Sequence, residues 1–523
     1  MMGIVLIALV GGKAEGGQEV LPLIPWPVEI ERGTGQYVLS GGAQVDYGPG
    51  AEAVMDLMVT ELEKTTGLKL ALQAAAGLGE MVVVIGESAT LPSNLSPPAF
   101  PEAYLLQVTA DSVVLAGGDR AGLLWAFRTW QQLLHEEQGQ WSCPAVFIRD
   151  YPRFPRRSLL LDPARNFLSL DALKRQVDLL SAFKFNVLHF HLTDDQGWRF
   201  ESKAFPRLQE VGGEGQFYTQ EQLRELVAYA QARGVTVMPE MDMPGHSTAL
   251  LAAFPELSCS GKPVEVSHTV GIHPNALCPA KEEVYTFLKP LLAEVAAVFP
   301  SEFIHIGSDE VMAADWEQCP ACDKLLAENS LAGKKGLHAY FLRRVSEIIV
   351  GLGKRTLAWD EVTEFAPPEV VIQAWRRQSW AEVAARQGRE ALVSPVLYTY
   401  VDYNRLLLSL RRCYAFDPVP AGLLPEEAKL ILGGGANLWG EWATEDRLDL
   451  QLYPRLLALA EVYWSPPEQK NYPDFLLRLD RVRTQLEAQG VRFGDVNPAM
   501  VWDTVKLVGK GVQIAAGMLA DRL

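Results

Sequence analysis

Two adjacent carboxylates, Asp309 and Glu310, end an apolar run that begins at Phe303. Such a run predicts a buried strand, and a strand with this ending delivers both carboxyl groups to one place. When two carboxylates share a site, the pKa of one rises, so that acid can donate a proton near neutral pH. The alternative is a strand followed by an acidic helix cap in solvent. The rest of the chain has to decide between these two interpretations.

Eight β-rich segments after residue 156 predict strands, with helical patterns between them. They cover residues 158–161, 186–192, 235–239, 303–306, 356–359, 370–375, 391–396 and 430–438. Thr219 and Gln222 form a capping box ahead of one helix, and an apolar face from Val284 to Val295 marks another. Eight strands alternating with helices predict an α/β fold, a (β/α)8 barrel rather than an open sheet. The first strand lacks a glycine-rich phosphate fingerprint, which weighs against dinucleotide binding.

Polar or aromatic side chains follow every predicted strand. In chain order they are Asp162 and Arg165; Asp194 and Asp195; Glu240, Asp242 and His246; Asp309 and Glu310; Trp359, Asp360 and Glu361; Trp375 and Arg376; Tyr398, Tyr400 and Asp402; and Trp439 and Glu441. Barrel enzymes place their active sites at the carboxyl ends of the strands. Eight strand ends that converge on one rim therefore favour a catalytic site over solvated loops.

The chain divides into four predicted parts: an N-terminal extension or remnant signal segment (1–19), a small α+β accessory domain (20–150), the catalytic barrel (151–490) and a C-terminal helical tail (491–523). In the accessory domain, residues 53–64 and 121–134 predict helices, 81–85 a strand, and 105–108 with 113–116 a hairpin. A proline-rich stretch, residues 151–155, marks the start of the barrel.

Composition limits the partners of this protein. The 523 residues are 48% hydrophobic and 21% charged, with a net charge of −17, which is typical of a globular protein and argues against nucleic acid or an anionic membrane as partner. The apolar run Ile4–Val10 is too short to span a bilayer. It resembles the core of an export signal, although no basic residue precedes it and no Ala-x-Ala site follows. We therefore expect an exported protein, with a cytoplasmic location as the alternative; the oligomeric state stays open.

Six cysteines in so long a chain do not form a disulfide scaffold. Cys319 and Cys322 are spaced like half of a zinc site or a redox pair. Because no second close pair exists along the chain and zinc takes four ligands, we expect structural thiols or one local disulfide, and no metal or cofactor.

Carboxylates together with tryptophans at the mouth of a barrel are typical of a glycosidase active site. Indole faces stack on sugar rings, and acidic and Arg side chains hydrogen-bond sugar hydroxyls. Six segments go further and resemble, in order, motifs of the family 20 glycoside hydrolases, the β-N-acetylhexosaminidases. They are residues 159–167, 184–199, 239–246, 305–311, 359–361 and 436–441. The resemblance spans residues 157–464, and the unit before the barrel resembles the accessory domain of that family.

The resemblance implies substrate-assisted retention, in which the 2-acetamido oxygen of the substrate attacks the anomeric carbon and gives an oxazolinium intermediate. Glu310 is then the general acid/base. Asp309 orients the acetamido N–H and stabilises the developing positive charge, and Tyr400 binds the acetamido oxygen. Asp194 and His246 form a relay behind Glu310 that tunes its proton affinity; Asp195 is a close alternative to Asp194.

The same resemblance implies how a sugar is held. Arg165 binds O3 and O4, while Asp402 and Glu441 bind O4 and O6. Trp359, Trp375 and Trp439 line the acetamido pocket and the underside of the sugar. Gripping the non-reducing hydroxyls favours exo cleavage of terminal GlcNAc or GalNAc from glycans or chitooligosaccharides. Lacto-N-biosidase specificity on the same scaffold is the alternative.

Two departures from the family pattern bear on the site. Ser308 stands where the family usually has glycine, so a positive φ there would be strained. Gly435 replaces a common glutamine. Two rival interpretations also stay open at this point. One is a metal-dependent barrel hydrolase that uses His189, His191, His246 and His305. The other is a sugar-binding barrel without catalysis.

Overall fold

The computed structural model describes residues 20–74, 80–86, 95–312 and 314–495. The predicted N-terminal extension lies outside these residues, and so does the predicted C-terminal tail beyond residue 495. None of the helices in the described part of the chain has the length and apolar character needed to cross a bilayer.

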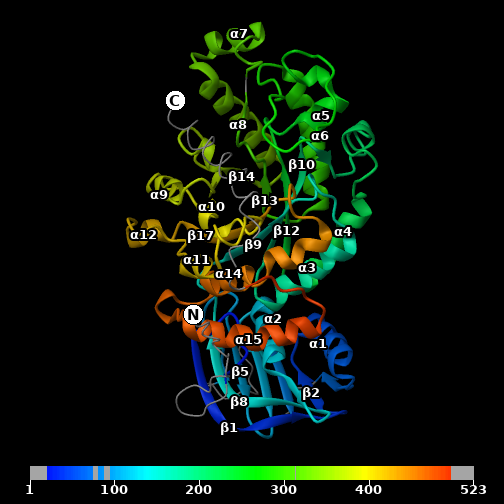
Figure 1. Ribbon diagram of the computed structural model, residues 1–523, viewed down its shortest axis with the longest axis vertical. Coiled ribbons are helices and arrows are strands. Elements are labelled where there is room, and N and C mark those ends of the chain that lie inside the picture. Colours follow the sequence, from blue (N-terminus) through cyan, green and yellow to red (C-terminus); the bar gives the residue numbers. More distant parts are fainter. Residues whose placement is uncertain (1–19, 75–79, 87–94, 313, 496–523) are drawn as a thin grey trace, which may run out of the picture.

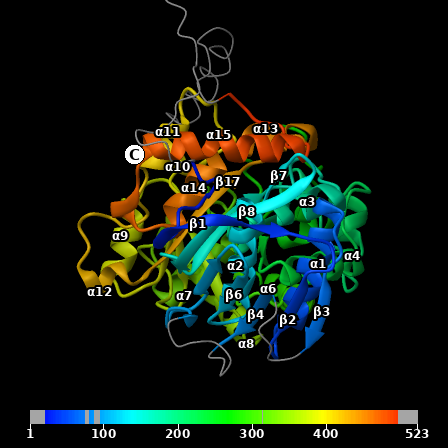
Figure 2. The same ribbon diagram turned by 90° about the horizontal axis from the view of Figure 1, so that it is seen from below.

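The first unit is a sheet with two helices on one face (Figures 1 and 2). Its elements are β1 (Glu29–Leu39), β2 (Gln44–Tyr47), α1 (Glu52–Thr66), β3 (Ala71–Ala74), β4 (Met81–Ile85), β5 (Tyr104–Val108), β6 (Val113–Gly117), α2 (Arg120–Leu133), β7 (His135–Glu137) and β8 (Gln140–Asp150). The strand order is β1-β8-β5-β6-β4-β2-β3, with β7 paired to β8. The predicted helices, hairpin and strand of this unit are all present; β1, β2, β3, β7 and β8 were missed.

The second unit is a closed barrel of eight parallel strands. They are β9 (Arg156–Leu161), β10 (Val187–Asp194), β12 (Thr236–Met241), β13 (Phe303–His305), β14 (Arg355–Trp359), β15 (Val371–Ala374), β16 (Ala391–Val393) and β17 (Ile431–Leu438). Each pairs with the next, and β17 and β10 both pair with β9, which closes the ring. A two-residue strand, β11 (Gly197–Trp198), folds back on β10. The (β/α)8 prediction is confirmed, with all eight strands near their expected positions.

Helices surround the barrel. They are α3 (Leu170–Ala182), α4 (Gln220–Ala232), α5 (Thr248–Ala253), α6 (Glu282–Val298), α7 (Pro320–Asn329), α8 (Gly333–Gly351), α9 (Ser379–Arg386), α10 (Val396–Thr399), α11 (Leu410–Ala415), α12 (Pro425–Ala428), α13 (Leu448–Leu452), α14 (Arg455–Trp464) and α15 (Tyr472–Ala488). The capping box of Thr219 and Gln222 starts α4 as predicted.

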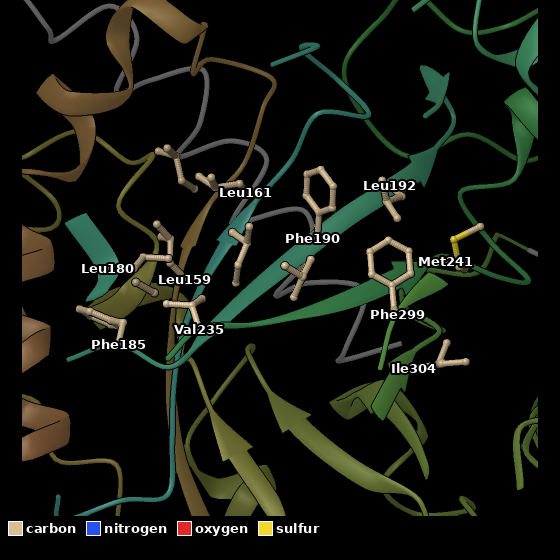
Figure 3. Packing of buried hydrophobic residues seen from close by; sticks show 14 of the residues in the cluster. Leu159, Leu161, Leu180, Phe185, Phe190, Leu192, Val235, Met241, Phe299 and Ile304 are labelled. Atoms are coloured by element: carbon tan, nitrogen blue, oxygen red, sulfur yellow. The ribbon is translucent and has the colours of Figure 1, made fainter. Parts of the chain in front are cut away.

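Alternation along the strands separates the core from the barrel interior. Figure 3 shows Leu159, Leu161, Phe190 and Leu192 in the hydrophobic core that β9 and β10 share with the surrounding helices. The intervening residues of the strands face inward. A lower interior layer is apolar and consists of Val187, Met238, Phe303, Leu357, Val371 and Leu392. Polar side chains lie above it, toward the carboxyl ends of the strands, so the barrel becomes polar where the site forms.

The two units share a buried junction beside the amino ends of β9 and β10. The Asp150 carboxylate accepts hydrogen bonds from Tyr104 Oη (2.6 Å), Trp464 Nε1 (2.9 Å) and Lys184 Nζ (3.1 Å). Helix α15 runs across the same junction (Figure 1). The accessory unit therefore covers the barrel on the side away from the rim that holds the predicted site residues.

Candidate active site

The loop after β13 has an unusual backbone. Gly307, Ser308 and Glu310 have φ angles of +62°, +70° and +46°. A side chain on Gly307 would collide with Asp242, because its Cβ would lie 1.8 Å from Asp242 Oδ1. Ser308 is therefore strained as predicted, and it is held by a hydrogen bond between its Oγ and His338 Nε2 (2.8 Å). In this loop the side chains of Asp309 and Glu310 both lie within 4.0 Å of His246.

The carboxyl groups of Asp309 and Glu310 both face one imidazole. His246 Nε2 lies 3.6 Å from Glu310 Oε2 and 3.9 Å from Asp309 Oδ2. The Glu310 side chain is 30% exposed, while that of Asp309 is 12% exposed. The pair is therefore arranged as one accessible acid beside one buried acid, and it is not a solvated helix cap.

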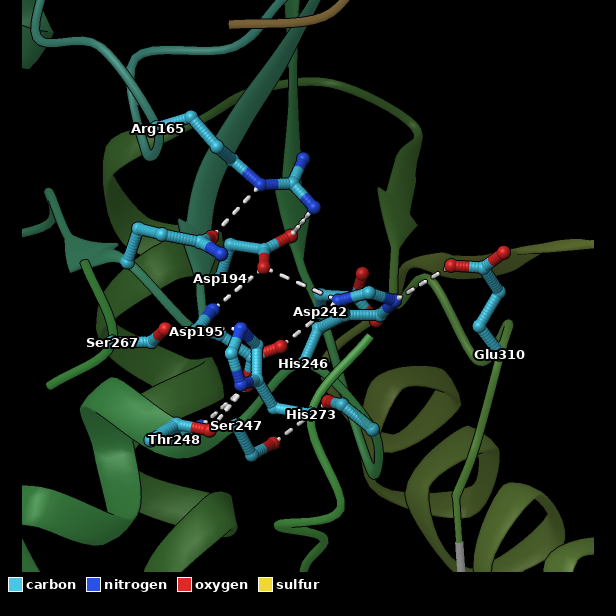
Figure 4. Close-up of polar contacts among 12 residues, drawn as sticks. Arg165, Asp194, Asp195, Asp242, His246, Ser247, Thr248, Ser267, His273 and Glu310 are labelled. Atoms are coloured by element: carbon cyan, nitrogen blue, oxygen red, sulfur yellow. Dashed lines mark hydrogen bonds and ion pairs between the residues drawn. The ribbon is translucent and has the colours of Figure 1, made fainter. Parts of the chain in front are cut away.

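A line of charged groups runs behind Glu310 (Figure 4). His246 Nδ1 lies 3.2 Å from Asp194 Oδ1 and 3.3 Å from Asp195 Oδ2. Asp194 Oδ2 in turn accepts from Arg165 Nη2 at 2.5 Å. Burial alone would lower the pKa of His246, but the Asp194 carboxylate and the neighbouring acids raise it well above its ordinary value. The surrounding carboxylates therefore favour the protonated form of His246.

Arg165 is the fixed end of this line. Its Nε donates to Gln196 Oε1 (3.1 Å) and its Nη1 to Asp162 Oδ2 (3.0 Å). Although burial opposes the charge of Arg165, the carboxylates around it raise its pKa well above the usual value, and its charge helps to keep the pKa of Asp194 well below normal. Asp194 lies on the line between His246 and Arg165, whereas Asp195 is also tied to Thr248.

Electrostatics separates the two acids of the pair. Burial raises the pKa of the Asp309 carboxyl to about 7; the His246 cation opposes this shift, and the charges of Glu310 and Glu240 add to it. Ionised Asp309 is thus a buried anion that is stabilised by a nearby positive charge. Such a group stabilises a cation that develops beside it during a reaction.

Beneath the pair, Glu240 holds the histidines of the barrel interior. Its carboxylate lies 2.6 Å from His191 Nδ1, 2.9 Å from His189 Nε2 and 3.0 Å from His305 Nδ1. Trp359 Nε1 donates to it at 2.9 Å. All three histidines are fully buried.

Aromatic rings form one side of the site. Trp439 lies against Trp359 and Tyr400, with ring centroids 5.9 and 6.2 Å away, and the Arg165 guanidinium lies 5.2 Å above it. Trp375 stacks near Tyr400 at 6.1 Å and 25°. The structure therefore brings the three predicted tryptophans and Tyr400 into one continuous set of rings.

The last two predicted binding residues lie on the same rim. Asp402 is buried after the bridge between Tyr400 and Asn437, and Glu441 follows β17. The charge of Glu441 contributes to the raised pKa of Arg165.

Three further residues were not singled out as site residues. Asp242 accepts from Ser308 N–H (3.3 Å), and burial together with the charge of Asp309 raises its pKa well above normal. Glu361 accepts from Trp375 Nε1 at 3.1 Å. Gln196 holds Arg165. All three follow predicted strands, which was the signal in the sequence; their partners could not be read from it.

Several clusters of His and acidic side chains lie close enough together to hold a cation. They are His189, Glu240 and His305; His191, Asp194 and Asp242; Asp194, Asp195 and His246; and Asp242, His246 and Asp309. Every member is buried. In each cluster a histidine lies within 4.0 Å of a carboxylate oxygen of the same cluster.

Comparison with known proteins agrees with this geometry. The family model for the glycosyl hydrolase family 20 catalytic domain matches residues 154–467, and that for domain 2 of the family matches residues 20–151. β-Hexosaminidases from Porphyromonas gingivalis and Vibrio furnissii are 33% and 34% identical over 84% of this chain. The chain spans 60% of the length of the first and 76% of the second.

Solved structures are similar over nearly the whole chain. A chitobiase from Flavobacterium johnsoniae has a TM-score of 0.81 at 30% identity and covers 90% of this chain and 73% of its own. A β-N-acetylhexosaminidase from Bacteroides fragilis has a TM-score of 0.80 at 30% identity and covers 90% of this chain and 96% of its own. With the motifs, the barrel and the family match in agreement, this chain belongs to glycosyl hydrolase family 20.

Proposed function

We propose that this protein is an exo-acting, retaining β-N-acetylhexosaminidase that removes terminal non-reducing GlcNAc or GalNAc by substrate-assisted catalysis. The observation that supports it best is the pair of unlike acids, partly exposed Glu310 and buried Asp309, which lie 3.6 and 3.9 Å from His246 Nε2. Among the structural neighbours, the Vibrio harveyi protein is an exo-β-N-acetylglucosaminidase in complex with N-acetylglucosamine.

Glu310 donates its proton to the glycosidic oxygen. It is the more exposed of the two acids, so it can reach a leaving group that projects toward solvent. The adjacent His246 cation, held by Asp194, stabilises the carboxylate that remains after the transfer. The same carboxylate then removes a proton from the water that opens the intermediate.

Asp309 and Tyr400 act on the acetamido group. Ionised Asp309 accepts a hydrogen bond from the acetamido N–H, and its charge stabilises the oxazolinium cation as that cation forms. The Tyr400 hydroxyl donates to the acetamido oxygen and aims it at the anomeric carbon. The set of rings that Trp359, Trp375 and Trp439 form packs against the acetamido methyl group and the sugar.

Arg165, Asp402 and Glu441 hold the hydroxyls at the non-reducing end. Arg165 donates to Gln196, Asp162 and Asp194, and its Nη1 also lies 3.5 Å from His191 Nε2, so one N–H of Nη2 is left for a substrate oxygen. The carboxylates of Asp402 and Glu441 accept from hydroxyl groups. Gripping this end favours the release of one terminal sugar.

The test is hydrolysis of aryl β-GlcNAc, β-GalNAc and β-lacto-N-bioside substrates, with the anomer of the first product followed by NMR. We expect release of the monosaccharides with retention. Glu310→Gln should lower the rate on chitobiose about 10²–10⁴-fold and spare aryl substrates with good leaving groups. Glu317→Gln changes an exposed acid on the same loop and should have no effect.

An inverted product, or a sugar bonded covalently to the protein, would contradict the mechanism. Release of lacto-N-biose with inert monosaccharide substrates would instead favour the alternative specificity. A metal bound by the barrel histidines, with activity lost when a strong chelator removes it, would favour the metal-dependent hydrolase.

A further inference from the structure

Four of the six cysteines gather at one point beside the site. Cys259 lies just after α5, Cys278 just before α6, and Cys319 and Cys322 lie at the start of α7. Their four Sγ atoms all lie within 4.8 Å of one another. Cys143 and Cys413 belong to two other hydrophobic clusters. The fold therefore brings Cys259 and Cys278, which are not close along the sequence, next to the pair of Cys319 and Cys322.

The spacing of the sulfur atoms fits a metal better than a disulfide. Cys322 Sγ lies 3.7 Å from Cys259 Sγ and 3.9 Å from Cys278 Sγ, and all the cysteines are free thiols. A tetrahedral zinc site with Zn–S bonds of about 2.3 Å places neighbouring sulfurs about 3.8 Å apart. A disulfide between Cys322 and either Cys259 or Cys278 would leave the other of these two cysteines as a free thiol.

The surroundings also suit bound thiolates. Cys278, Cys319 and Cys322 are buried, and Cys259 is partly buried. Cys319 caps α7, so the positive end of the helix faces the sulfurs. Four thiolates in a closed tetrahedron are the ligand set of structural zinc, which keeps no open position for substrate.

The cluster lies where the fold has little other support. Residues 258–281 contain no helix or strand, and the same holds for the described residues between β13 and α7. Only a small group of buried side chains packs around the sulfurs: Ala276, Val311, Trp316 and Leu337. A metal would supply the stability that so small a core lacks.

These segments connect directly to the catalytic loops. Trp316 Nε1 donates to Leu277 O (3.1 Å), and Leu277 N–H donates to Pro244 O (3.0 Å), two residues before His246. Val311 follows Glu310 and packs in the cysteine cluster. We propose that Cys259, Cys278, Cys319 and Cys322 bind one zinc ion, which joins the loop after β12 to the loop after β13 and so fixes Glu310 relative to His246.

The test is metal analysis of the full chain purified without a chelating tag. We expect one zinc per chain by elemental mass spectrometry and four sulfur neighbours at about 2.3 Å in zinc X-ray absorption. Cys322→Ser and Cys278→Ser should lose the zinc, whereas Cys413→Ser, a buried thiol elsewhere, should keep it. Because the absorption measurement uses the unaltered chain, it tests for zinc bound by four sulfurs even if the variants fail to fold.

Three results would overturn the proposal: purified chain without zinc, disulfides among these cysteines in peptide mapping, or zinc with nitrogen or oxygen neighbours. None of these measurements depends on hydrolysis. Failure of the zinc proposal and failure of the proposed activity are therefore distinguishable.

Discussion

Replacing Asp309 by Asn should make the protein more stable and less active at the same time. Burial raises the pKa of this carboxyl from 3.8 to about 7. The folded state therefore binds the proton more tightly than the unfolded chain, and the wild type loses stability as pH rises from 3.8 to about 7. Asn keeps the shape of the side chain and removes this titration.

The magnitude follows from the pKa values. One pKa unit is worth about 1.4 kcal/mol, and the interval from pH 5 to pH 8 covers about two of the three units of the shift. The difference in unfolding free energy between Asp309→Asn and the wild type should therefore be about 2–3 kcal/mol larger at pH 8 than at pH 5, in favour of the variant. Its kcat/KM should fall on the order of 10²–10³-fold.

Urea unfolding of the variant and the wild type at both pH values measures the gap, with refolding checked at each pH. Asp315→Asn, an exposed acid on the same loop, is the control and should give no pH-dependent gap. A difference between variant and wild type that is equal at pH 5 and pH 8 would refute the reasoning, because Asp309 would then not titrate in this interval.

Three further predictions concern the same site. His246→Gln removes the cation that lowers the pKa of Asp309, so the acid limb of the kcat/KM profile should move to higher pH; an unmoved limb contradicts this. Ser308→Ala loses the hydrogen bond to His338 and keeps the backbone strain of a positive φ angle. Ser308→Gly also loses this hydrogen bond, but it relieves the strain. Thermal unfolding should rank wild type above Gly and Gly above Ala, with about 1 kcal/mol between the variants; equal variants would exclude strain. Tyr400→Phe should lower kcat by about 10–100-fold with little change in folding, and steady-state kinetics with circular dichroism decide this.

The barrel was predictable because its strands are buried on both faces. Such strands form short, nearly continuous apolar runs, and each one here ends at a polar group. Strand β1 was missed for the opposite reason. It lies at the edge of its sheet, and most of its side chains are exposed, so the residues Glu29–Leu39 show no apolar alternation. Its pairing with β8 depends on residues more than a hundred positions away, which no local pattern reports.

The sequence predicted which residues form the site better than it predicted which of them contact one another. Strand ends named Asp309, Glu310, His246 and Arg165, because parallel strands bring their carboxyl ends to one rim. The contact of Asp242 with Ser308 depends on the positive φ angles of the loop after β13. The meeting of four cysteines depends on three segments that are distant along the chain.

The buried junction at Asp150 has a consequence for how the chain can be divided. A fragment holding the barrel alone would uncover the Trp464 indole and leave the Lys184 ammonium without its counter-ion. A fragment holding the accessory unit alone would take away the Lys184 and Trp464 partners of the Asp150 carboxylate and open that charge to solvent. Neither half is then a self-sufficient module, and domain swaps between relatives should succeed only when both sides of this junction are exchanged together.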